Sequence, residues 1–468
     1  MQKVFKSCYA LDKRCYEAYG LTEDILMEHA ARGMAEYILK KFDKGSSVLI
    51  AAGVGNNGAD GIVLARQLYG DYNVKLFIPF ALKSEMAKLQ WQRAEALGIK
   101  SVSEMEDADV IVDAIFGAGL NREIDESTQK IVHKLNSFHG FKLACDVPTG
   151  VDENGLLSPI AFEADVTITM GAFKESLYVD ESKDVMGDIV RVDLGISAQK
   201  YEDETDIFVL EPSDLQLPSR TLSSTHKGHF GHAAIFCGEK EGAGIIAATA
   251  ASRFGAGLTT LVVHEKVSPP AYLMHSTEVP GNCTALAIGM GLGDHFDSDF
   301  LQKYVIQSHL PIVLDADSFH SEVLLSVLEQ KDREIVITPH PKEFSALWKI
   351  LTGEVFSVEE IQKNRFDMIR KFNAKYPHVT ILLKGANTLI MQEEKLYINP
   401  LGCSKLSKGG SGDVLSGLIV SLLVQGYTAI DATIQGSLAL VMAANRYAGA
   451  SYAMLPTDII EVLRDLED

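Results

Sequence analysis

The 468-residue chain has 47% hydrophobic and 23% charged residues, which is typical of a folded globular protein. Its length exceeds what one hydrophobic core usually supports, so two or three domains are expected. The formal net charge of −20 argues against sequence-independent nucleic-acid binding, which needs a basic surface. It does not exclude small anionic ligands, because converging backbone N–H groups create a local positive potential.

The sequence predicts neither a secretory signal nor a membrane span. Its N-terminus lacks an apolar signal segment, and no apolar run approaches the roughly 20 residues that a span needs. The six cysteines are scattered without a CxxC pair, which predicts reduced thiols, no disulfide framework and no zinc site. These features favour a cytoplasmic protein with no membrane partner.

Short apolar strands and amphipathic helices alternate in the first half of the chain. A helix over 23–42 is expected to begin at the N-cap Thr22. Strands are predicted at 48–52, 74–79, 110–115, 142–147, 166–170 and 189–192, and helices at 61–69, 84–97 and 126–138. This order predicts a parallel sheet covered on both faces, with ligands outside the carboxyl ends of the strands.

The alternation is interrupted between residues 196 and 227 by an acidic run, prolines and a Ser/Thr-rich segment, which predicts a domain boundary near residue 205. Beyond it, strands are expected at 233–237, 258–263, 285–289, 312–315, 335–338 and 380–384. Helices are expected at 244–254, 358–376 and 414–425, the second with a solvated outer face, and a hairpin at 388–398. The predicted class is α/β, with domains at 1–205 and 206–468.

A glycine-rich loop, 53–61, follows the first strand and opens a helix. It contains GxGxxG, but the acidic residue that a dinucleotide-binding fold places after its second strand is missing. Two adjacent amides, Asn56 and Asn57, and the carboxylate of Asp60 stand where that fold uses bare backbone. A simple Asn-Gly turn is the alternative interpretation.

Asp113 and Asp146 end two further strands of the same predicted sheet. A glycine-rich segment, 117–123, follows Asp113, and a Val-Pro-Thr-Gly turn follows Asp146. Oxygen atoms of Asn57, Asp113 and Thr149 could hold a hard cation. Either aspartate alone is equally compatible with a loop cap, but their occurrence on one sheet edge favours a ligand site.

In these motifs, residues 1–205 resemble the Rossmann-like epimerase domain of the bifunctional NAD(P)H-hydrate repair enzymes. The resemblance implies a potassium ion held by Asn57, Asp113 and Thr149. It also implies that the hydrated cofactor, NADHX or NADPHX, is bound by Asn56, Asn57, Gly58, Ala59, Asp60, Gly117, Ala118, Gly119, Leu120, Asn121, Arg122, Glu123 and Asp146. Asp146 is then the expected acid–base group, because epimerising the hydrate requires a proton donor or acceptor beside the ring.

A second glycine-rich stretch, 405–413, ends in Gly-Gly-Ser-Gly-Asp and opens an apolar helix. Backbone N–H groups that converge at a helix N-terminus form a site for phosphate oxygens. Asp413 would repel such an anion, so we interpret it as a base placed where a substrate hydroxyl meets a phosphoryl group. A helix cap is the alternative.

Other candidate groups lie at the predicted strand ends of the second domain. Lys384, which follows an apolar strand, is placed to meet phosphate, although a surface lysine is the alternative. His340 stands between two prolines and is either a functional or an ordinary loop histidine. Asp315 and Asp317 could reach magnesium or simply form a turn.

Residues 206–468 resemble the ribokinase-like dehydratase domain of the same family. The motifs are Lys227-Gly228 with Gly231-His232, the glycine-rich segments 242–244 and 289–293, Thr338–Phe344, Lys384–Thr388 and the 405–413 stretch, which we call the Gly-Asp loop. The resemblance implies that ADP is bound by Lys384, Gly385, Ala386, Asn387, Thr388 and Gly412. The hydrated cofactor would contact Ala243, Gly291, His340 and Asp413. Met290, for the usual proline, and Lys342, for a common glycine, depart from the family pattern.

The implied function is metabolite repair: the R and S hydrates are interconverted, and the S form is dehydrated at the expense of ADP. Asp413 would deprotonate the ring hydroxyl, which attacks the terminal phosphoryl group of ADP, and phosphate then leaves. Magnesium is expected, and the resemblance also implies a homo-oligomer; ADP is preferred over ATP on the resemblance alone. The alternatives are a ribokinase-like small-molecule kinase fused to a nucleotide-sensing domain, and a non-catalytic N-terminal interaction module.

Overall fold

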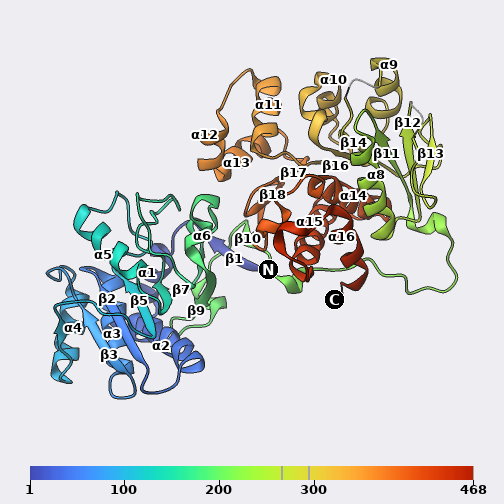
Figure 1. Ribbon diagram of the computed structural model, residues 1–468. Helices are drawn as coiled ribbons and strands as arrows, with labels where there is room; N and C mark the ends of the chain where they lie inside the picture. Colours follow the sequence, from blue (N-terminus) through green and yellow to red (C-terminus); the bar gives the residue numbers. More distant parts are fainter. Residues whose placement is uncertain (265–266, 294–295, 467–468) are drawn as a thin grey trace. The chain divides into compact units, whose positions relative to one another are not determined.

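The computed structural model describes residues 1–264, 267–293 and 296–466 (Figure 1). Its internal contacts divide the chain into two compact units, one of Lys3–Thr205 and one of Asp206–Asp468 together with Met1–Gln2. Within the described residues, every helix is too short or too polar to cross a lipid bilayer.

The first unit is built on a seven-stranded sheet with the order β4-β3-β2-β5-β6-β7-β9, in which every neighbouring pair is parallel. Its strands are β2 (Ser47–Ala52), β3 (Asn73–Phe77), β4 (Ser101–Val102), β5 (Val110–Ala114), β6 (Phe141–Cys145), β7 (Val166–Met170) and β9 (Asp188–Val192). The central strands are buried along their length, because helices cover both faces of the sheet.

The main helices of this unit are α1 (Tyr9–Ala18), α2 (Glu23–Lys41), α3 (Asn56–Leu68), α4 (Glu85–Ala96) and α5 (Glu126–Asn136). Successive residues of β2 face opposite layers. Val48 and Ile50 pack in the core that includes α2 and α3, whereas Leu49 and Ala51 pack in the core that includes α5. The predicted strands and helices of this half are therefore confirmed, although α3 begins five residues earlier than expected.

A short parallel pair that the sequence did not predict completes this unit. β1 (Gln2–Phe5) pairs with β8 (Phe173–Lys174), with Val4 opposite Phe173 and Phe5 opposite Lys174. The pairing ties the start of the chain to the segment after β7, and α1 follows directly from β1. Residues near position 10 are thereby brought close to residues near position 174.

The second unit has a mixed sheet with the order β13-β12-β11-β14-β15-β16-β17-β18-β19-β10. Its strands are β10 (Ile207–Val209), β11 (His232–Cys237), β12 (Leu258–Val263), β13 (Met274–Ser276), β14 (Ala285–Ile288), β15 (Ile312–Leu314), β16 (Ile335–Ile337), β17 (Thr380–Leu383), β18 (Thr388–Gln392) and β19 (Lys395–Asn399). The pairs from β13 to β17 are parallel, and β17, β18 and β19 are antiparallel. The predicted hairpin is confirmed.

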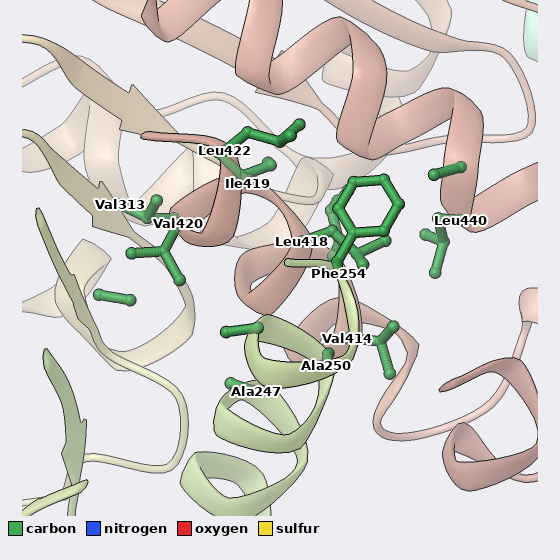
Figure 2. Packing of buried hydrophobic residues seen from close by; sticks show 14 of the residues in the cluster. Ala247, Ala250, Phe254, Val313, Val414, Leu418, Ile419, Val420, Leu422 and Leu440 are labelled. Carbon is green, nitrogen blue, oxygen red and sulfur yellow. The ribbon is translucent and has the colours of Figure 1, made fainter. Parts of the chain in front are cut away.

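Helix α14 (Ser411–Val424) lies at the centre of this unit's core, between α8 (Glu241–Arg253) and α15 (Ala429–Arg446) (Figure 2). Every residue from Val414 to Val424 is buried, as expected for a helix that is apolar on all sides. Gly417 allows close contact with α8, because a Cβ atom there would lie 2.2 Å from the carbonyl oxygen of Ala247. This packing fixes the N-terminal turn that carries Asp413.

The prediction of one solvated helix at 358–376 was wrong. The chain forms α12 (Val358–Lys363) and α13 (Arg365–Lys375), separated at Asn364, whose φ of −121° and ψ of 32° are not helical. Phe366, Ile369 and Phe372 of α13 are buried, and the helix packs on β17 and β18. The surrounding charges concealed this apolar stripe. Helix α11 (Pro341–Thr352), which begins with proline at its first position, was not predicted either.

Candidate functional sites

Each sheet reverses its strand order at one point, where ligands of open α/β sheets usually bind. In the first unit this point lies between β2 and β5, and a Cβ atom on Gly53 would lie 1.9 Å from the carbonyl oxygen of Ile115. In the second unit it lies between β11 and β14, and a Cβ atom on Gly238 would lie 1.9 Å from the carbonyl oxygen of Leu292. Glycine at both positions lets the two loops meet.

A cavity of about 380 Å³ opens at the switch point of the first unit. The sequence-predicted residues that line it are Asn56, Asn57, Asp60, Gly117, Ala118, Gly119, Leu120 and Asp146. Gly58 and Ala59 are buried in the first turn of α3, whereas Asn121, Arg122 and Glu123 are exposed and are not among the lining residues. The structure therefore brings most, but not all, of the predicted set to one cavity.

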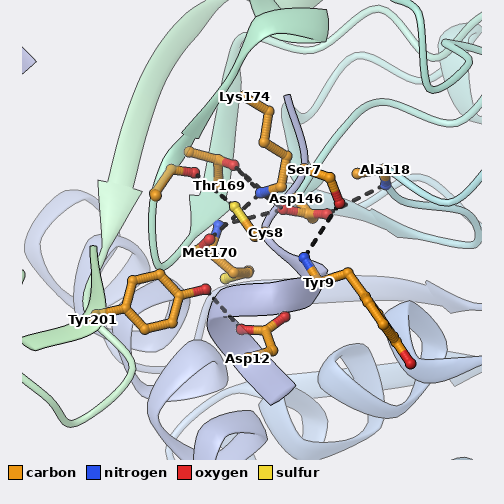
Figure 3. A network of polar contacts seen from close by, with 11 residues as sticks. Ser7, Cys8, Tyr9, Asp12, Ala118, Asp146, Thr169, Met170, Lys174 and Tyr201 are labelled. Carbon is orange, nitrogen blue, oxygen red and sulfur yellow. Dashed lines mark hydrogen bonds and ion pairs between the residues drawn. The ribbon is translucent and has the colours of Figure 1, made fainter. Parts of the chain in front are cut away.

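Asp146 lies directly after β6 in a left-handed backbone conformation, with a φ of 68°. Its Oδ1 atom lies 2.6 Å from the Lys174 ammonium nitrogen, and its Oδ2 atom accepts a hydrogen bond from the backbone N–H of Ala118 (Figure 3). Burial opposes ionisation, but Lys174 and the hydrogen bonds outweigh it and hold the Asp146 pKa below its ordinary value. Asp146 is therefore an ionised carboxylate on the cavity wall.

Two of the three proposed cation ligands, Asp113 and Thr149, contact each other directly. Thr149 donates to Asp113 through its backbone N–H and its hydroxyl group, both at 2.7 Å. The hydroxyl oxygen also accepts from the backbone N–H of Phe116. A Cβ atom on the next residue, Gly117, would lie 2.9 Å from Asn57 Oδ1. Asn57 Oδ1 therefore lies beside Gly117, the residue that follows the Phe116 N–H bound by Thr149.

Asp113 is fully buried at the end of β5, and burial raises its pKa to about 6 despite the bonds from Thr149. The Nδ2 atom of Asn57 is buried without a hydrogen-bond partner among the described residues. A buried carboxylate beside amide and hydroxyl oxygens has the donor chemistry of a hard-cation site, so these residues fit potassium.

The cavity also has residues that the sequence did not single out. Cys8 and Asp12, from the N-terminal segment, and Lys174, from β8, all line it. Tyr201 donates a hydrogen bond to Asp12 at 2.7 Å. Lys174 was the one detectable signal, because it is a lone cation four residues after the apolar strand β7. The placement of Asp12 depends on the unpredicted β1–β8 pair.

In the second unit, Asp413 occupies the third position of α14. The N-cap is Gly410, in a left-handed conformation with a φ of 98°, and Asp413 receives no hydrogen bond from the described residues. The alternative that Asp413 caps the helix is therefore wrong. Burial and the nearby Asp315 carboxylate raise its pKa to about 6, a change that Lys384 opposes.

Lys384 is not a free surface lysine. Its ammonium nitrogen lies 2.6 Å from Oδ1 of Asp315, a buried residue at the end of β15. The other oxygen of Asp315 accepts from Ser416 of α14 at 2.8 Å. A Cβ atom on Gly412 would lie 3.3 Å from the Lys384 nitrogen, so the Gly-Asp loop and Lys384 are adjacent.

The other predicted nucleotide residues follow Lys384: the turn from β17 into β18 contains Gly385, Ala386 and Asn387, and Thr388 is the first residue of β18. Arg365 donates to the carbonyl oxygens of Leu383 and Asn387, both at 2.8 Å, which fixes both sides of this turn. The predicted substrate residues Ala243 and Gly291 also meet, since a Cβ atom on Gly291 would lie 3.2 Å from that of Ala243.

His340 caps α11, and its Nδ1 atom accepts from the backbone N–H groups of Lys342 and Glu343 at 3.2 Å. Its Nε2 atom lies 3.2 Å from a Glu343 oxygen, which indicates the tautomer protonated at Nε2. Burial raises the pKa of Glu343, and Asp315 raises it further, whereas Lys384 opposes the change. Glu343, which contacts His340, therefore lies within electrostatic range of Asp315 and Lys384.

Both aspartates proposed for magnesium already have hydrogen-bond partners. Asp315 is bound by Lys384 and Ser416, and Asp317 accepts a hydrogen bond from the backbone N–H of Gly293 at 3.1 Å. Among the described residues, no three His, Cys, Asp or Glu side chains converge as a metal-ligand set. All six cysteines are free thiols, as predicted, and all but Cys403 are buried.

The comparisons with known proteins identify both halves. A family model described as NAD(P)H-hydrate dehydratase matches residues 233–465, and one described as YjeF-related protein N-terminus matches residues 23–176. The bifunctional NAD(P)H-hydrate repair enzyme Nnr of Helicobacter pylori is 39% identical, over 100% of both chains. This chain belongs to that family.

The Nnr enzyme of Escherichia coli is 31% identical over 97% of this chain and 91% of its own length. Among solved structures, the ADP/ATP-dependent NAD(P)H-hydrate dehydratase of Bacillus subtilis is 25% identical, with a TM-score of 0.46, over 53% of this chain and 92% of that one. Membership of the repair family over the whole chain confirms the predicted bifunctional epimerase and dehydratase. It excludes the kinase and interaction-module alternatives.

The two residues that depart from the family pattern lie in the loop after β14 and in the first turn of α11. Met290 is fully buried in the core between Gly289 and Gly291, whose φ angles of 113° and 61° form the loop. Lys342 is the second residue of α11, and its N–H donates to His340 as described. Neither substitution removes a charged group from the site, since the usual residues at these positions are proline and glycine.

Proposed function

We propose that this repair enzyme converts hydrated NADH and NADPH back to the reduced cofactors at two separate sites. The observation that carries the proposal is that each unit places a carboxylate beside glycine-rich loops: Asp146 lines the cavity at the switch point of the first sheet, and Asp413 lies in the first turn of α14, next to Gly412 and close to Lys384. The division at 205/206 would then separate an epimerase domain, 1–205, from a dehydratase domain, 206–468.

In the first site, we assign the hydrated cofactor to the cavity beside Asn56–Asp60, the 117–123 loop and Asp146. Asp146 exchanges the proton with the ring, because it is ionised and lines the cavity. Potassium, held by Asn57, Asp113 and Thr149, would supply a fixed positive charge beside the ligand. Asp113 keeps the Thr149 loop in place through its two hydrogen bonds.

In the second site, Asp413 acts as the base toward the ring hydroxyl of the S epimer. With a pKa near 6 and no hydrogen bond from the described residues, its carboxylate is ionised at neutral pH and available to a proton. The hydroxyl oxygen attacks the terminal phosphoryl group of ADP, and AMP leaves. Phosphate then departs from the ring with the electron pair of its C–O bond, a neighbouring ring C–H bond gives up its proton, and the double bond is restored.

The nucleotide is assigned to Lys384, the following turn 385–388 and Gly412. Lys384 is adjacent to Gly412, so its charge would meet the phosphate chain, and the N–H groups at the start of α14 would stabilise the transferring group. His340, Ala243 and Gly291 would contact the hydrated cofactor. Magnesium would enter with the nucleotide and neutralise its phosphate oxygens.

We also propose a preference for ADP, a cytoplasmic location and assembly into a homo-oligomer. These three properties follow from the family resemblance. Comparing ADP with ATP at equal concentrations tests the first, and light scattering of the purified chain tests the third.

The test of the function uses chemically prepared mixed R and S hydrates of NADH with ADP, magnesium and potassium, and follows the absorbance of the reduced nicotinamide. The wild-type chain should convert the whole mixture. Asp146→Ala should leave the R epimer largely unconverted, and Asp413→Asn should convert neither epimer while still interconverting them. No recovery of absorbance with ADP or ATP would refute the proposal.

A further inference from the structure

Lys174 is a buried cation that lines the cavity of the first unit, and none of the motifs described above includes it. Its side chain is only 6% exposed. Its ammonium nitrogen lies 2.6 Å from Asp146 Oδ1, 2.8 Å from Thr169 Oγ1 and 3.4 Å from the carbonyl oxygen of Met170 (Figure 3). An ammonium group has three N–H donors, so these acceptors use all of them.

The two oxygens of Asp146 have different surroundings. Oδ1 is engaged by Lys174, by the Thr169 hydroxyl at 3.3 Å and by the backbone N–H of Met170 at 3.3 Å. Oδ2 accepts one hydrogen bond, from the backbone N–H of Ala118 at 3.2 Å. Oδ2 also lies 3.2 Å from the place where Gly117 would carry a Cβ atom, so glycine leaves that oxygen uncovered. Oδ2 is the oxygen that retains capacity for a proton.

The other titratable groups that face Asp146 are neutral or acidic. They come from two parts of the chain: Cys8 and Asp12 from the N-terminal segment, and Asp60 from α3. Lys174 is the one basic side chain among the described residues that line the cavity. Lys174 therefore supplies the positive charge that keeps Asp146 ionised against the effects of burial and of the acidic neighbours.

The fold fixes this pair from both sides. Lys174 ends β8, which is held by its pairing with β1, and Asp146 is turned toward it by a left-handed backbone conformation. Such a conformation is uncommon for residues other than glycine and is usually maintained by surrounding contacts. Here the contacts are those that Lys174, Thr169 and Met170 make with Oδ1.

We propose that Lys174 is a positioning residue of the epimerase reaction, which binds Asp146 Oδ1 so that Oδ2 is presented to the hydrated ring as an ionised base. The proposal rests on the epimerase function proposed above. Oδ2 takes the proton of the ring hydroxyl; the O–H electron pair forms a carbonyl group as the adjacent ring C–N bond opens onto nitrogen. Closure on the other carbonyl face returns the proton, so the reaction needs no oxidant, reductant or second reactant.

The geometry disfavours two other roles for Lys174. It does not bind a phosphate group of the ligand, because its three donors are occupied and its side chain is almost fully enclosed. It does not exchange the proton itself, because burial would lower its pKa but Asp146 raises it well above the ordinary lysine value. It acts through Asp146.

The experiment measures kcat/KM for epimerisation of the purified R hydrate between pH 5 and 9 in the full-length chain. In Lys174→Met, loss of the cation should move the acidic limb of the profile up by about 1–3 pH units. Lys174→Arg keeps the charge, so its limb should stay within about half a unit of wild type, although its rate should fall because a guanidinium group cannot reproduce the three short contacts. Lys142→Met is the matched control, because among the described residues the ammonium group of Lys142 bonds only to the Phe138 carbonyl oxygen.

Dehydration of the S hydrate by the same chain reports whether the protein is intact. If Lys174→Met does not fold, Thr169→Val removes one donor to Oδ1 and one acceptor of Lys174, and it should move the limb in the same direction by less than about one unit. An acidic limb unchanged in every folded variant overturns the proposal. Absence of epimerisation in the wild-type chain would instead overturn the epimerase function itself.

Discussion

Replacing Asp413 by asparagine should inactivate the dehydratase site and at the same time stabilise the second unit. The asparagine side chain has the same shape but cannot accept the substrate proton, so the rate should fall by about 100-fold to 10,000-fold. The opposite effect on stability follows from the cost of ionising this carboxyl group in the folded protein, where burial and Asp315 raise its pKa.

The magnitude follows from the pKa. The folded value of about 6 exceeds the ordinary 3.8 by about two units, which corresponds to about 3 kcal/mol at roughly 1.4 kcal/mol per unit. Because Asp413 is partly exposed to solvent, we expect about 1–3 kcal/mol. The folded state binds the proton more tightly than the unfolded state. The destabilisation is therefore fully present above about pH 6, is small at pH 4 and disappears below about pH 3, where both states are protonated.

The assay compares wild type and Asp413→Asn by thermal unfolding at pH 8 and pH 4, following the transition of the second unit. The variant should unfold several degrees higher at pH 8 and at nearly the same temperature as wild type at pH 4. Wild-type dehydration should be about tenfold slower at pH 5 than at pH 8, because about a tenth of Asp413 is ionised there. Equal stability at pH 8, or a variant with near-normal activity, would contradict this reasoning.

Three further substitutions test the packing around the sites. Gly53→Ala should lower the thermal midpoint of the first unit and abolish epimerisation but spare the dehydratase, because the new Cβ atom would meet the Ile115 carbonyl oxygen at 1.9 Å. Thermal unfolding and separate assays of epimerisation and dehydration test this. Tyr201→Phe removes the hydrogen bond to Asp12 and should cost about 1–3 kcal/mol in urea unfolding of the first unit. Leu418→Ala, at a fully buried position of α14, should cost about 2–5 kcal/mol in the second unit, measured in the same way.

The sequence alone determined the class of fold and the edge at which ligands bind. Apolar strands such as 110–115 and 166–170, separated by helices, specify parallel sheets, because only a strand covered on both faces is apolar along its length. It also indicated Asp113, Asp146 and Asp413 as candidates, because each stands where a strand ends or a helix begins. These are local features, and local periodicity is what a sequence encodes directly.

The tertiary structure decided how these groups are paired and ionised. Lys174 meets Asp146, and Lys384 meets Asp315, across separations of 28 and 69 residues. Such contacts depend on strand order and register, which residue periodicity does not specify. The opposite pKa directions of Asp146 and Asp413 follow from that arrangement. Lys174 binds Asp146 directly and lowers its pKa. Asp413 instead lies near Asp315, which is itself paired with Lys384, and its pKa is raised.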